Sequence, residues 1–184
     1  HYLGERNLVP NTKQIVFTGA PGAGKTTIWE GLRSSSYHLV AESARTILAS
    51  EVGQSLREKG ELGFANQCFD LDKKNLHQLD CSKQTTVFDR GLGDSLGYYI
   101  WHGKPIPEPM RRFSEKYRYS GPIVAFPPWE EIYESDELRV QTYVEAVESY
   151  STVIGAWRAI GYDTIEIPKM AIQDRVNWVG TILN

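Results

Sequence analysis

Cysteine is scarce in this chain of 184 residues, which contains only Cys68 and Cys81. Two cysteines cannot build a disulfide framework, and their spacing matches no metal-binding pattern. They favour a pair of reduced thiols in a cytoplasmic protein, with a single disulfide bridge as the alternative.

The chain also has no strong excess of charge of one sign and no long apolar run. Its formal net charge is -3, so its overall charge attracts neither nucleic acid nor an anionic membrane. No stretch approaches the roughly 18 apolar residues of a membrane-spanning helix, and no signal-peptide pattern precedes the first expected strand. We therefore expect a cytoplasmic protein that binds neither nucleic acid nor membranes.

Internal repeats and low-complexity tracts are absent as well, whereas hydrophobic residues make up 41% of the chain. A chain of this length and composition can bury a full core without disulfides. We expect a single domain over residues 1–184, with residues 1–12 as a polar lead-in.

The most informative feature that is present is the phosphate-binding pattern G-x-x-x-x-G-K-[ST] at residues 19–26. An apolar run at residues 14–18 precedes it and predicts a buried strand, and a helical pattern at residues 27–32 follows it. Glycines allow successive backbone N–H groups to turn toward phosphate oxygens, and the start of a helix adds positive charge. A chance glycine turn would lack this context. The predicted nucleotide-binding residues are Gly19, Ala20, Pro21, Gly22, Ala23, Gly24, Lys25, Thr26 and Thr27.

Two side chains of this loop have predicted chemical roles. Lys25 should neutralise the β- and γ-phosphates, and the Thr26 hydroxyl should ligate Mg²⁺. The predicted cofactors are therefore ATP and Mg²⁺.

The rest of the chain alternates between strand and helix patterns. Such alternation predicts an α/β fold in which helices cover both faces of a parallel sheet. Ligands of these sheets bind at the carboxyl ends of the strands. Further strands are expected at residues 37–41, 85–88, 122–126 and 164–167, with helical stretches within 44–80, 92–118, 131–160 and 171–183.

Charged residues follow two of these strands at the expected ligand-binding edge. Asp89 ends an apolar strand and is the best candidate for a Mg²⁺ ligand, with Arg90 next to it. A surface ion pair of Asp89 with Arg90 is the alternative. Glu42 follows another strand and is the candidate general base for an attacking hydroxyl. Its alternative role is to stabilise the start of a helix.

A third charged segment follows the strand at residues 122–126. Two prolines end that strand, and an acidic stretch then leads to Arg139 before a helical pattern over about 140–160. A lid segment with an arginine suits closure over a transferring phosphoryl group. Arg139 is therefore a candidate catalytic residue, and the alternative is a solvated arginine paired with Glu134 or Asp136.

Four segments besides the phosphate loop complete a recognisable set, namely Val40–Arg45, Val87–Gly91, Phe126–Glu130 and Glu137–Thr142. Together they resemble the predicted AAA-type small ATPases, a P-loop family similar in layout to thymidylate, deoxynucleoside and ribosylnicotinamide kinases. The resemblance covers roughly residues 14–180. It implies a three-layer P-loop NTPase fold, with a five-stranded parallel sheet in the order 2-3-1-4-5 and a small lid at residues 130–142. It also implies that Glu42 and Asp89-Arg90 are placed as in nucleoside kinases.

Missing features exclude two other classes of P-loop protein. A regulatory GTPase would carry Asn-Lys-x-Asp and Asp-x-x-Gly motifs, and neither occurs at a usable position, because the residue three after Asp89 is Leu92. An oligomeric AAA motor needs an additional helical domain, for which 184 residues leave no room. A kinase and a stand-alone NTPase are the two classes left.

An acceptor pocket distinguishes these two classes. Aromatic side chains that can stack on a base or a pyridine ring are candidates for its walls. Asp94 could bind a sugar hydroxyl, although capping of its helix is the favoured role. By analogy with the fold alone, we expect Lys169 and Met170 to border the adenine. The candidate wall residues are Phe64, Tyr98, Tyr99 and Trp101.

The sequence thus predicts an enzyme that transfers phosphate from Mg-ATP to a small hydroxyl-bearing acceptor, with a nucleoside or nucleotide favoured. The alternative is a stand-alone ATPase that acts as a nucleotide-dependent protein-binding switch. The acidic net charge of -3 disfavours a polynucleotide end kinase, because such an enzyme needs a basic channel. The predicted catalytic residues are Lys25, Glu42, Asp89, Arg90 and Arg139, and the predicted metal ligands are Thr26 and Asp89.

Overall fold

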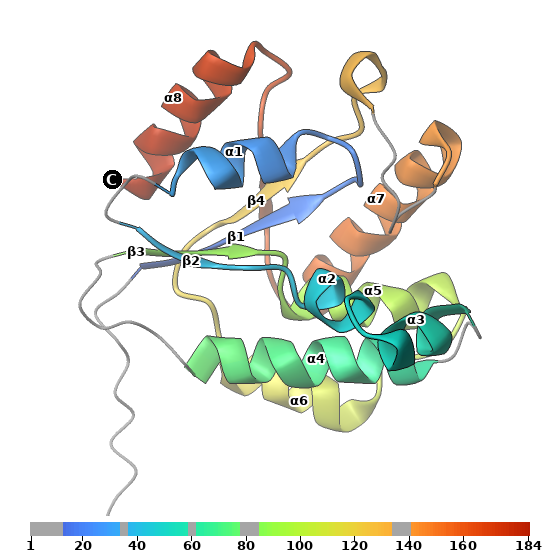
Figure 1. Cartoon of the computed structure of the whole chain (residues 1–184). Helices are drawn as coiled ribbons and strands as arrows, with labels where there is room; N and C mark the ends of the chain where they lie inside the picture. The colour runs from blue at the N-terminus through green and yellow to red at the C-terminus, as the bar shows by residue number, and fades with distance from the viewer. Residues whose placement is uncertain (1–12, 34–36, 59–61, 78–84, 134–140) are drawn as a thin grey trace, which may run out of the picture.

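The computed structural model describes residues 13–33, 37–58, 62–77, 85–133 and 141–184. A five-stranded parallel sheet with the order β2-β3-β1-β4-β5 lies at its centre (Figure 1). This order confirms the predicted fold class, and every predicted strand is present with ends that differ by one residue at most. The strands are β1 Lys13–Gly19, β2 His38–Val40, β3 Thr85–Asp89, β4 Ile123–Phe126 and β5 Thr164–Glu166.

The predicted helical stretches are divided more finely than the sequence pattern indicates. The stretch within 44–80 forms three helices, and the stretch within 131–160 contains a short 3₁₀ helix and one long helix. The long helix begins late because Thr142 caps it, accepting a hydrogen bond from the Glu145 N–H at 3.2 Å. The described helices are α1 Lys25–Gly31, α2 Ser43–Leu48, α3 Glu51–Glu58, α4 Leu62–His77, α5 Leu92–Trp101, α6 Glu108–Lys116, η1 Glu130–Ile132, α7 Tyr143–Ala159 and α8 Ile172–Leu183.

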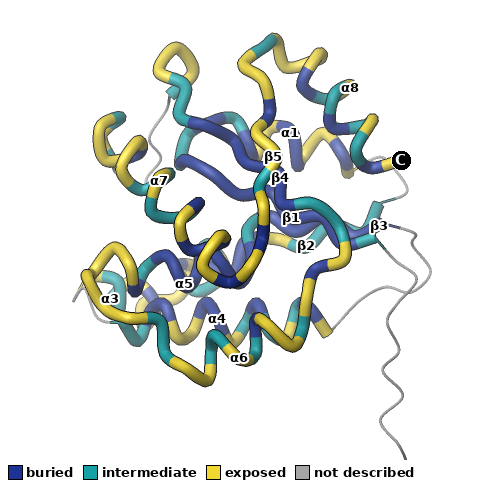
Figure 2. The backbone as a smooth tube through the Cα atoms, turned by 180° about the vertical axis from the view of Figure 1, so that it is seen from behind, coloured by how far each residue is buried: buried dark blue, intermediate teal, exposed yellow. Residues whose placement is uncertain are grey.

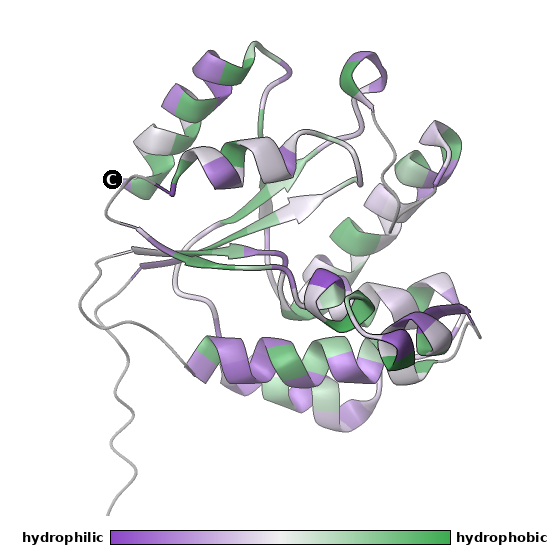
Figure 3. Cartoon of the chain, in the orientation of Figure 1, coloured by the Kyte–Doolittle hydropathy of each residue, from purple (hydrophilic) through white to green (hydrophobic). Residues whose placement is uncertain are grey.

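Helices cover both faces of the sheet, with α1 and α8 on one face and α4 to α7 toward the other (Figure 1). Side chains alternate along β1, so that Ile15 and Phe17 pack with α1 and α8, whereas Val16 packs with Phe69 of α4 and Trp157 of α7. The central strands are buried and hydrophobic, and the outward helix faces are exposed and mostly polar (Figures 2 and 3). The predicted three-layer arrangement is therefore confirmed.

Parallel pairing brings the carboxyl ends of β1 and β3 to one edge, because Phe17 is the register partner of Asp89. The phosphate loop that follows β1 and the acid that ends β3 consequently lie side by side.

The predicted lid at residues 130–142 is described only at its start, in η1, and at its end, in residues 141 and 142. Arg139 lies outside the described residues, as does the polar lead-in at residues 1–12.

Two further expectations concern cysteines and membranes. Cys68 is a free, buried thiol, and Cys81 lies outside the described residues. Within the part of the chain that the structure describes, no helix has both the length and the apolar character needed to span a bilayer.

Candidate nucleotide and acceptor site

The phosphate loop connects the carboxyl end of β1 to α1. Gly22 and Gly24 have φ angles of 66° and 82°, in the left-handed region that turns successive N–H groups toward one concave surface. Gly19 has a φ of 133°, and a Cβ atom there would lie 2.2 Å from the carbonyl oxygen of Phe126. Only glycine allows this close contact between the loop and β4. α1 begins at Lys25, two residues earlier than predicted.

Lys25 and Asp89 form a buried ion pair at the base of the loop. The Lys25 Nζ lies 2.8 Å from the Asp89 Oδ1, and both side chains are about 5% exposed. The strand register makes this contact possible, because Lys25 follows β1 and Asp89 ends the adjacent β3. The pair fixes the ammonium group beside the loop that would receive nucleotide phosphates.

The residues predicted to hold Mg²⁺ suit that ion chemically. Mg²⁺ prefers hard oxygen ligands, usually one or two from the protein, and completes its shell with phosphate oxygens and water. Thr26 is exposed at the start of α1, and Asp89 supplies a carboxylate beside Lys25. The described residues contain no group of three or more metal-binding side chains, so phosphates would have to complete such a site. Metal binding by Thr26 and Asp89 stays a prediction.

Arg90 connects the phosphate loop to the acids of the site. Its Nη1 donates to the carbonyl oxygen of Gly19 at 3.0 Å and contacts Asp94 Oδ1 at 2.8 Å. Its Nε lies 3.2 Å from Glu42 Oε1. Arg90 has a φ of 66° and is the one described non-glycine residue with a positive φ. Such strain persists where surrounding contacts enforce it, and it commonly marks functional positions. The surface pair of Asp89 with Arg90 is therefore not what the structure shows.

Glu42 is buried where β2 meets α2, with 2% of its surface exposed. It occupies the N-cap position of α2, but its side chain makes no capping hydrogen bond. Its two carboxylate oxygens instead face guanidinium groups, Oε1 that of Arg90 and Oε2 that of Arg45 at 3.4 Å. Glu42 therefore forms ion pairs in the site and does not cap the helix with its side chain, and its role as general base stays a prediction.

Asp94 has the predicted capping role in α5 and additional contacts that the sequence does not reveal. Its Oδ2 accepts from the N–H of Gly91 at 3.1 Å, which caps the helix. Its Oδ1 accepts from the Thr18 hydroxyl at 2.7 Å, and its Oδ2 from the Trp157 indole at 3.2 Å. Asp94 thus joins the end of β1, the start of α5 and the buried side of α7, and it orients Arg90.

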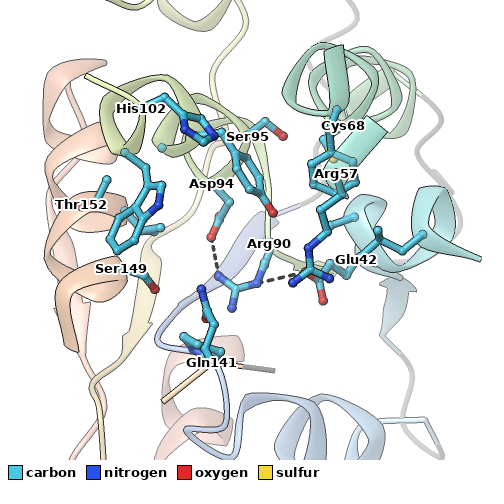
Figure 4. Close-up of a pocket in the computed structure, with 18 residues that line it drawn as sticks. Glu42, Arg57, Cys68, Arg90, Asp94, Ser95, His102, Gln141, Ser149 and Thr152 are labelled. Atoms are coloured by element: carbon cyan, nitrogen blue, oxygen red, sulfur yellow. Dashed lines mark hydrogen bonds and ion pairs between the residues drawn. The ribbon is translucent and has the colours of Figure 1, made fainter. Parts of the chain in front are cut away.

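A cavity of about 260 Å³ opens beside these residues (Figure 4). Helix α7 contributes Ser149 and Thr152 to one wall, and Glu42 and Arg57 belong to the opposite wall. The phosphate loop reaches the cavity through Pro21. The lining residues are Pro21, Glu42, Ala44, Leu48, Arg57, Phe64, Cys68, Arg90, Asp94, Ser95, Gly97, Tyr98, Trp101, His102, Gln141, Ser149, Thr152 and Val153.

Three of the four predicted aromatic walls line this cavity. Phe64 and Tyr98 meet edge to face, with ring centroids 5.2 Å apart, and Trp101 is 42% exposed at the rim. The prediction for Tyr99 is wrong: its ring is buried, and its hydroxyl donates to Asn66. Consecutive helical residues point about 100° apart, and this turn directs Tyr98 of α5 to the cavity and Tyr99 toward Asn66 of α4.

Two side chains of the cavity wall, Cys68 and Tyr98, remain uncharged. Burial and the nearby Asp72 raise the pKa of the Cys68 thiol, so this side chain stays protonated rather than acting as a nucleophile. Burial likewise raises the pKa of the Tyr98 hydroxyl. The lining polar residues of α3 and α7, such as Arg57 and Thr152, have no local motif that would have identified them.

Asp72 of α4 is a buried acid that the sequence did not single out. It accepts hydrogen bonds from Ser43 at 2.5 Å and from Ser95 at 2.6 Å. Ser43 directly follows Glu42, and Ser95 lines the cavity, so Asp72 ties α2 and α5 together behind the site. Burial raises the pKa of Asp72 from 3.8 to about 7, and the two serine hydroxyls partly oppose this shift.

Replacing Asp72 by asparagine should change the pH dependence of stability. The folded protein keeps the Asp72 proton up to about pH 7, whereas the unfolded chain loses it near 3.8. The contribution of Asp72 to the unfolding free energy therefore falls as the pH rises between these values, by at most about 1.4 kcal/mol per pH unit. As the pH rises through this range, the unfolding free energy of Asp72→Asn, measured by urea unfolding, should therefore rise relative to that of wild type. A stability difference that is independent of pH would contradict the prediction.

Two groups of predicted residues are not tested by this geometry. Lys169 is exposed and Met170 is half-buried in the segment between β5 and α8, and their place beside adenine stays a prediction. The role of Arg139 also stays a prediction, because this residue lies outside the described residues.

Comparison with known proteins identifies the family. A sequence profile described as AAA domain matches residues 14–175. The chain belongs to this AAA domain family. No curated protein has a sequence that matches the chain. The family, the phosphate loop and the sheet order together identify a P-loop kinase or NTPase, and the predicted resemblance to AAA-type P-loop proteins is confirmed.

Solved structures share the fold of this AAA domain protein at low sequence identity. Shikimate kinase from Acinetobacter baumannii in complex with shikimate has a TM-score of 0.59 and 17% identity, covering 95% of this chain and 94% of that one. NadR protein in complex with NR has a TM-score of 0.63 and 12% identity, covering 94% of this chain. The chain spans only 50% of that NadR structure. These similarities establish a P-loop kinase fold.

Proposed function

We propose that this protein is a phosphotransferase that uses Mg-ATP to phosphorylate a small hydroxyl-bearing acceptor, with a nucleoside or nucleotide favoured. The observation that carries the proposal is the cavity of about 260 Å³ in which Pro21 of the phosphate loop, Glu42 and Arg90 line the same space. A kinase needs an acceptor space next to the transferring phosphate, whereas an ATPase needs room only for water.

The acceptor hydroxyl would attack the γ-phosphorus while the bond to the ADP oxygen breaks. Glu42 is placed to take the hydroxyl proton, because its carboxylate borders the cavity from the end of β2. Arg90 contacts both Glu42 and the Gly19 carbonyl, so it can orient the base relative to the phosphate loop. Lys25 would neutralise phosphate charge, and Thr26 and Asp89 would hold Mg²⁺, which would supply further positive charge for the phosphates.

The cavity walls suit an acceptor with both an aromatic ring and hydroxyl groups. Phe64, Tyr98 and Trp101 offer apolar and aromatic surface on one part of the cavity. Ser149 and Thr152 offer hydroxyls from α7 on another part. This combination matches a base or pyridine ring joined to a sugar. The two structural neighbours were solved with the small molecules shikimate and NR, which supports a small acceptor.

A nucleotide-dependent protein-binding switch is the competing function, and acceptor-stimulated turnover separates the two. In a kinase, the lid should close and Arg139 should act mainly when both sites are filled. We therefore expect slow ADP formation from Mg-ATP alone and faster ADP formation with a suitable nucleoside. Arg139→Ala should reduce the stimulated rate by about 10²-fold or more and leave basal hydrolysis nearly unchanged.

A coupled assay of ADP release would measure both rates in wild type and in Arg139→Ala. Arg158→Ala is a matched control, because Arg158 is an exposed arginine on α7 and does not line the cavity. ADP formation that is indifferent to every nucleoside and nucleotide, together with a protein partner that distinguishes ATP from ADP, would favour the switch instead.

A further inference from the structure

Arg175 of α8 is a buried arginine next to the phosphate loop. Only 1% of its surface is exposed. Its Nη1 donates to the carbonyl oxygen of Ala23 at 2.9 Å, and its Nε donates to the carbonyl oxygen of Pro168 at 3.2 Å. Its Nη2 is buried without a hydrogen-bond partner, and no carboxylate within the described ranges forms an ion pair with it.

A buried guanidinium without a carboxylate partner is costly for the isolated protein. Burial accordingly lowers the pKa of Arg175 from its ordinary value. The rings of Phe126 and Trp129 lie 5.3 Å and 5.0 Å from its guanidinium carbon and offset part of this cost. An anion bound at the phosphate loop would offset more of this cost, because the positive charge of Arg175 lies behind the loop and attracts the anion.

The contact with Ala23 also determines where the next amide points. The Ala23 carbonyl and the Gly24 N–H belong to one peptide group, and the described chain has no cis peptide bond. These two groups point in opposite directions in a trans peptide. The Gly24 N–H therefore points away from Arg175. A Cβ atom on Gly24 would lie only 3.0 Å from the Arg175 Nη1, so the guanidinium leaves little room for a side chain at this position of the loop.

We propose that Arg175 is a positioning residue of the nucleotide site, which holds the Ala23–Gly24 peptide in the orientation that binds phosphate and places a positive charge behind the loop. This inference rests on the proposed function, because it assumes that the loop binds a nucleotide. The Arg175 side chain connects α8 and the segment at Pro168 to the phosphate loop. Its specific consequence is that loss of Arg175 weakens binding through the β- and γ-phosphates more than binding through the rest of the nucleotide.

The test compares Arg175→Gln and Arg175→Lys with wild type, using Mg-ADP, Mg-tripolyphosphate and AMP as ligands. Calorimetry would give the dissociation constants for the first two, and displacement of a fluorescent nucleotide would give that for AMP. Arg175→Gln should weaken ADP and tripolyphosphate binding by about tenfold or more and AMP binding by less than about threefold. Arg175→Lys retains the charge and should lie between wild type and Arg175→Gln. Arg158→Gln, which removes an exposed arginine, should leave all three constants unchanged.

A purely structural role would give a different result. Arg175→Gln with normal ADP and tripolyphosphate binding, or with equal loss for all three ligands, would overturn the proposal. If circular dichroism shows that Arg175→Gln is unfolded, the test uses Arg175→Lys instead. The measured quantity is then the amide signal of Gly24 in nuclear magnetic resonance spectra. We expect ADP to shift this signal strongly in wild type and less in Arg175→Lys, and an equal shift would overturn the proposal. Failure of wild type to bind ADP and tripolyphosphate would instead refute the proposed function itself.

Discussion

Replacing Lys25 by alanine should lower the affinity for Mg-ATP by about tenfold or more, and the rate of phosphate transfer by a larger factor. A charge-assisted hydrogen bond contributes about 1.5 to 3 kcal/mol, and more where charge develops in the transition state. The Lys25 ammonium is buried at the start of α1 and held by Asp89 at 2.8 Å, so water cannot readily replace it beside the phosphates. Calorimetry with Mg-ATP would measure the affinity.

The control for this variant is Lys74→Ala, which removes an exposed lysine from α4. Loss of Lys25 also leaves the Asp89 carboxylate without its lysine, so thermal unfolding should first establish that the variant is folded at the assay temperature. Equal ATP affinities for wild type and a folded Lys25→Ala would refute the assignment of the phosphate loop.

The second large effect separates the two acids of the site. Glu42→Gln should slow phosphate transfer by about 10² to 10⁴, as expected for loss of a general base, with Mg-ATP affinity nearly unchanged. Asp89→Asn should instead weaken Mg²⁺-dependent nucleotide binding. The structure supports this division, because Asp89 contacts Lys25 at the phosphate loop, whereas Glu42 borders the cavity.

Single-turnover kinetics and Mg²⁺-dependent calorimetry would measure these two effects. Glu51→Gln is a matched control, because Glu51 is an exposed glutamate at the start of the nearby α3. If Glu42→Gln abolished Mg²⁺-dependent binding while Asp89→Asn preserved it, the two roles would have to be exchanged.

The parts of this site that depend on local sequence could be predicted. The phosphate loop needs its glycines and its lysine at fixed spacing within a few residues, so the pattern alone located it. The rule that ligands bind at the carboxyl ends of parallel strands then directed attention to Glu42, Asp89 and Arg90. The structure brings Arg90 into contact with Glu42 and Asp89 into contact with Lys25.

Contacts between distant segments could not be predicted in the same way. Arg175 lies 152 positions from Ala23, and Trp157 lies 63 positions from Asp94. No local pattern marks such pairs, because tertiary packing alone brings them together. The error at Tyr99 arose from helix phase, since an aromatic pair such as Tyr98-Tyr99 does not show which ring faces the cavity. The role of Asp72 depends on two serines from separate helices.

Transfer of phosphate to a small molecule is the central claim, and identification of the product tests it most directly. Wild-type protein would be incubated with Mg-ATP and a panel of nucleosides, nucleotides and pyridine ribosides, and mass spectrometry would detect phosphorylated acceptors. We expect one chemical class to yield a phosphorylated product, in an amount equal to the ADP formed, and Glu42→Gln to yield far less. Formation of ADP and inorganic phosphate with no phosphorylated acceptor anywhere in the panel would contradict the claim.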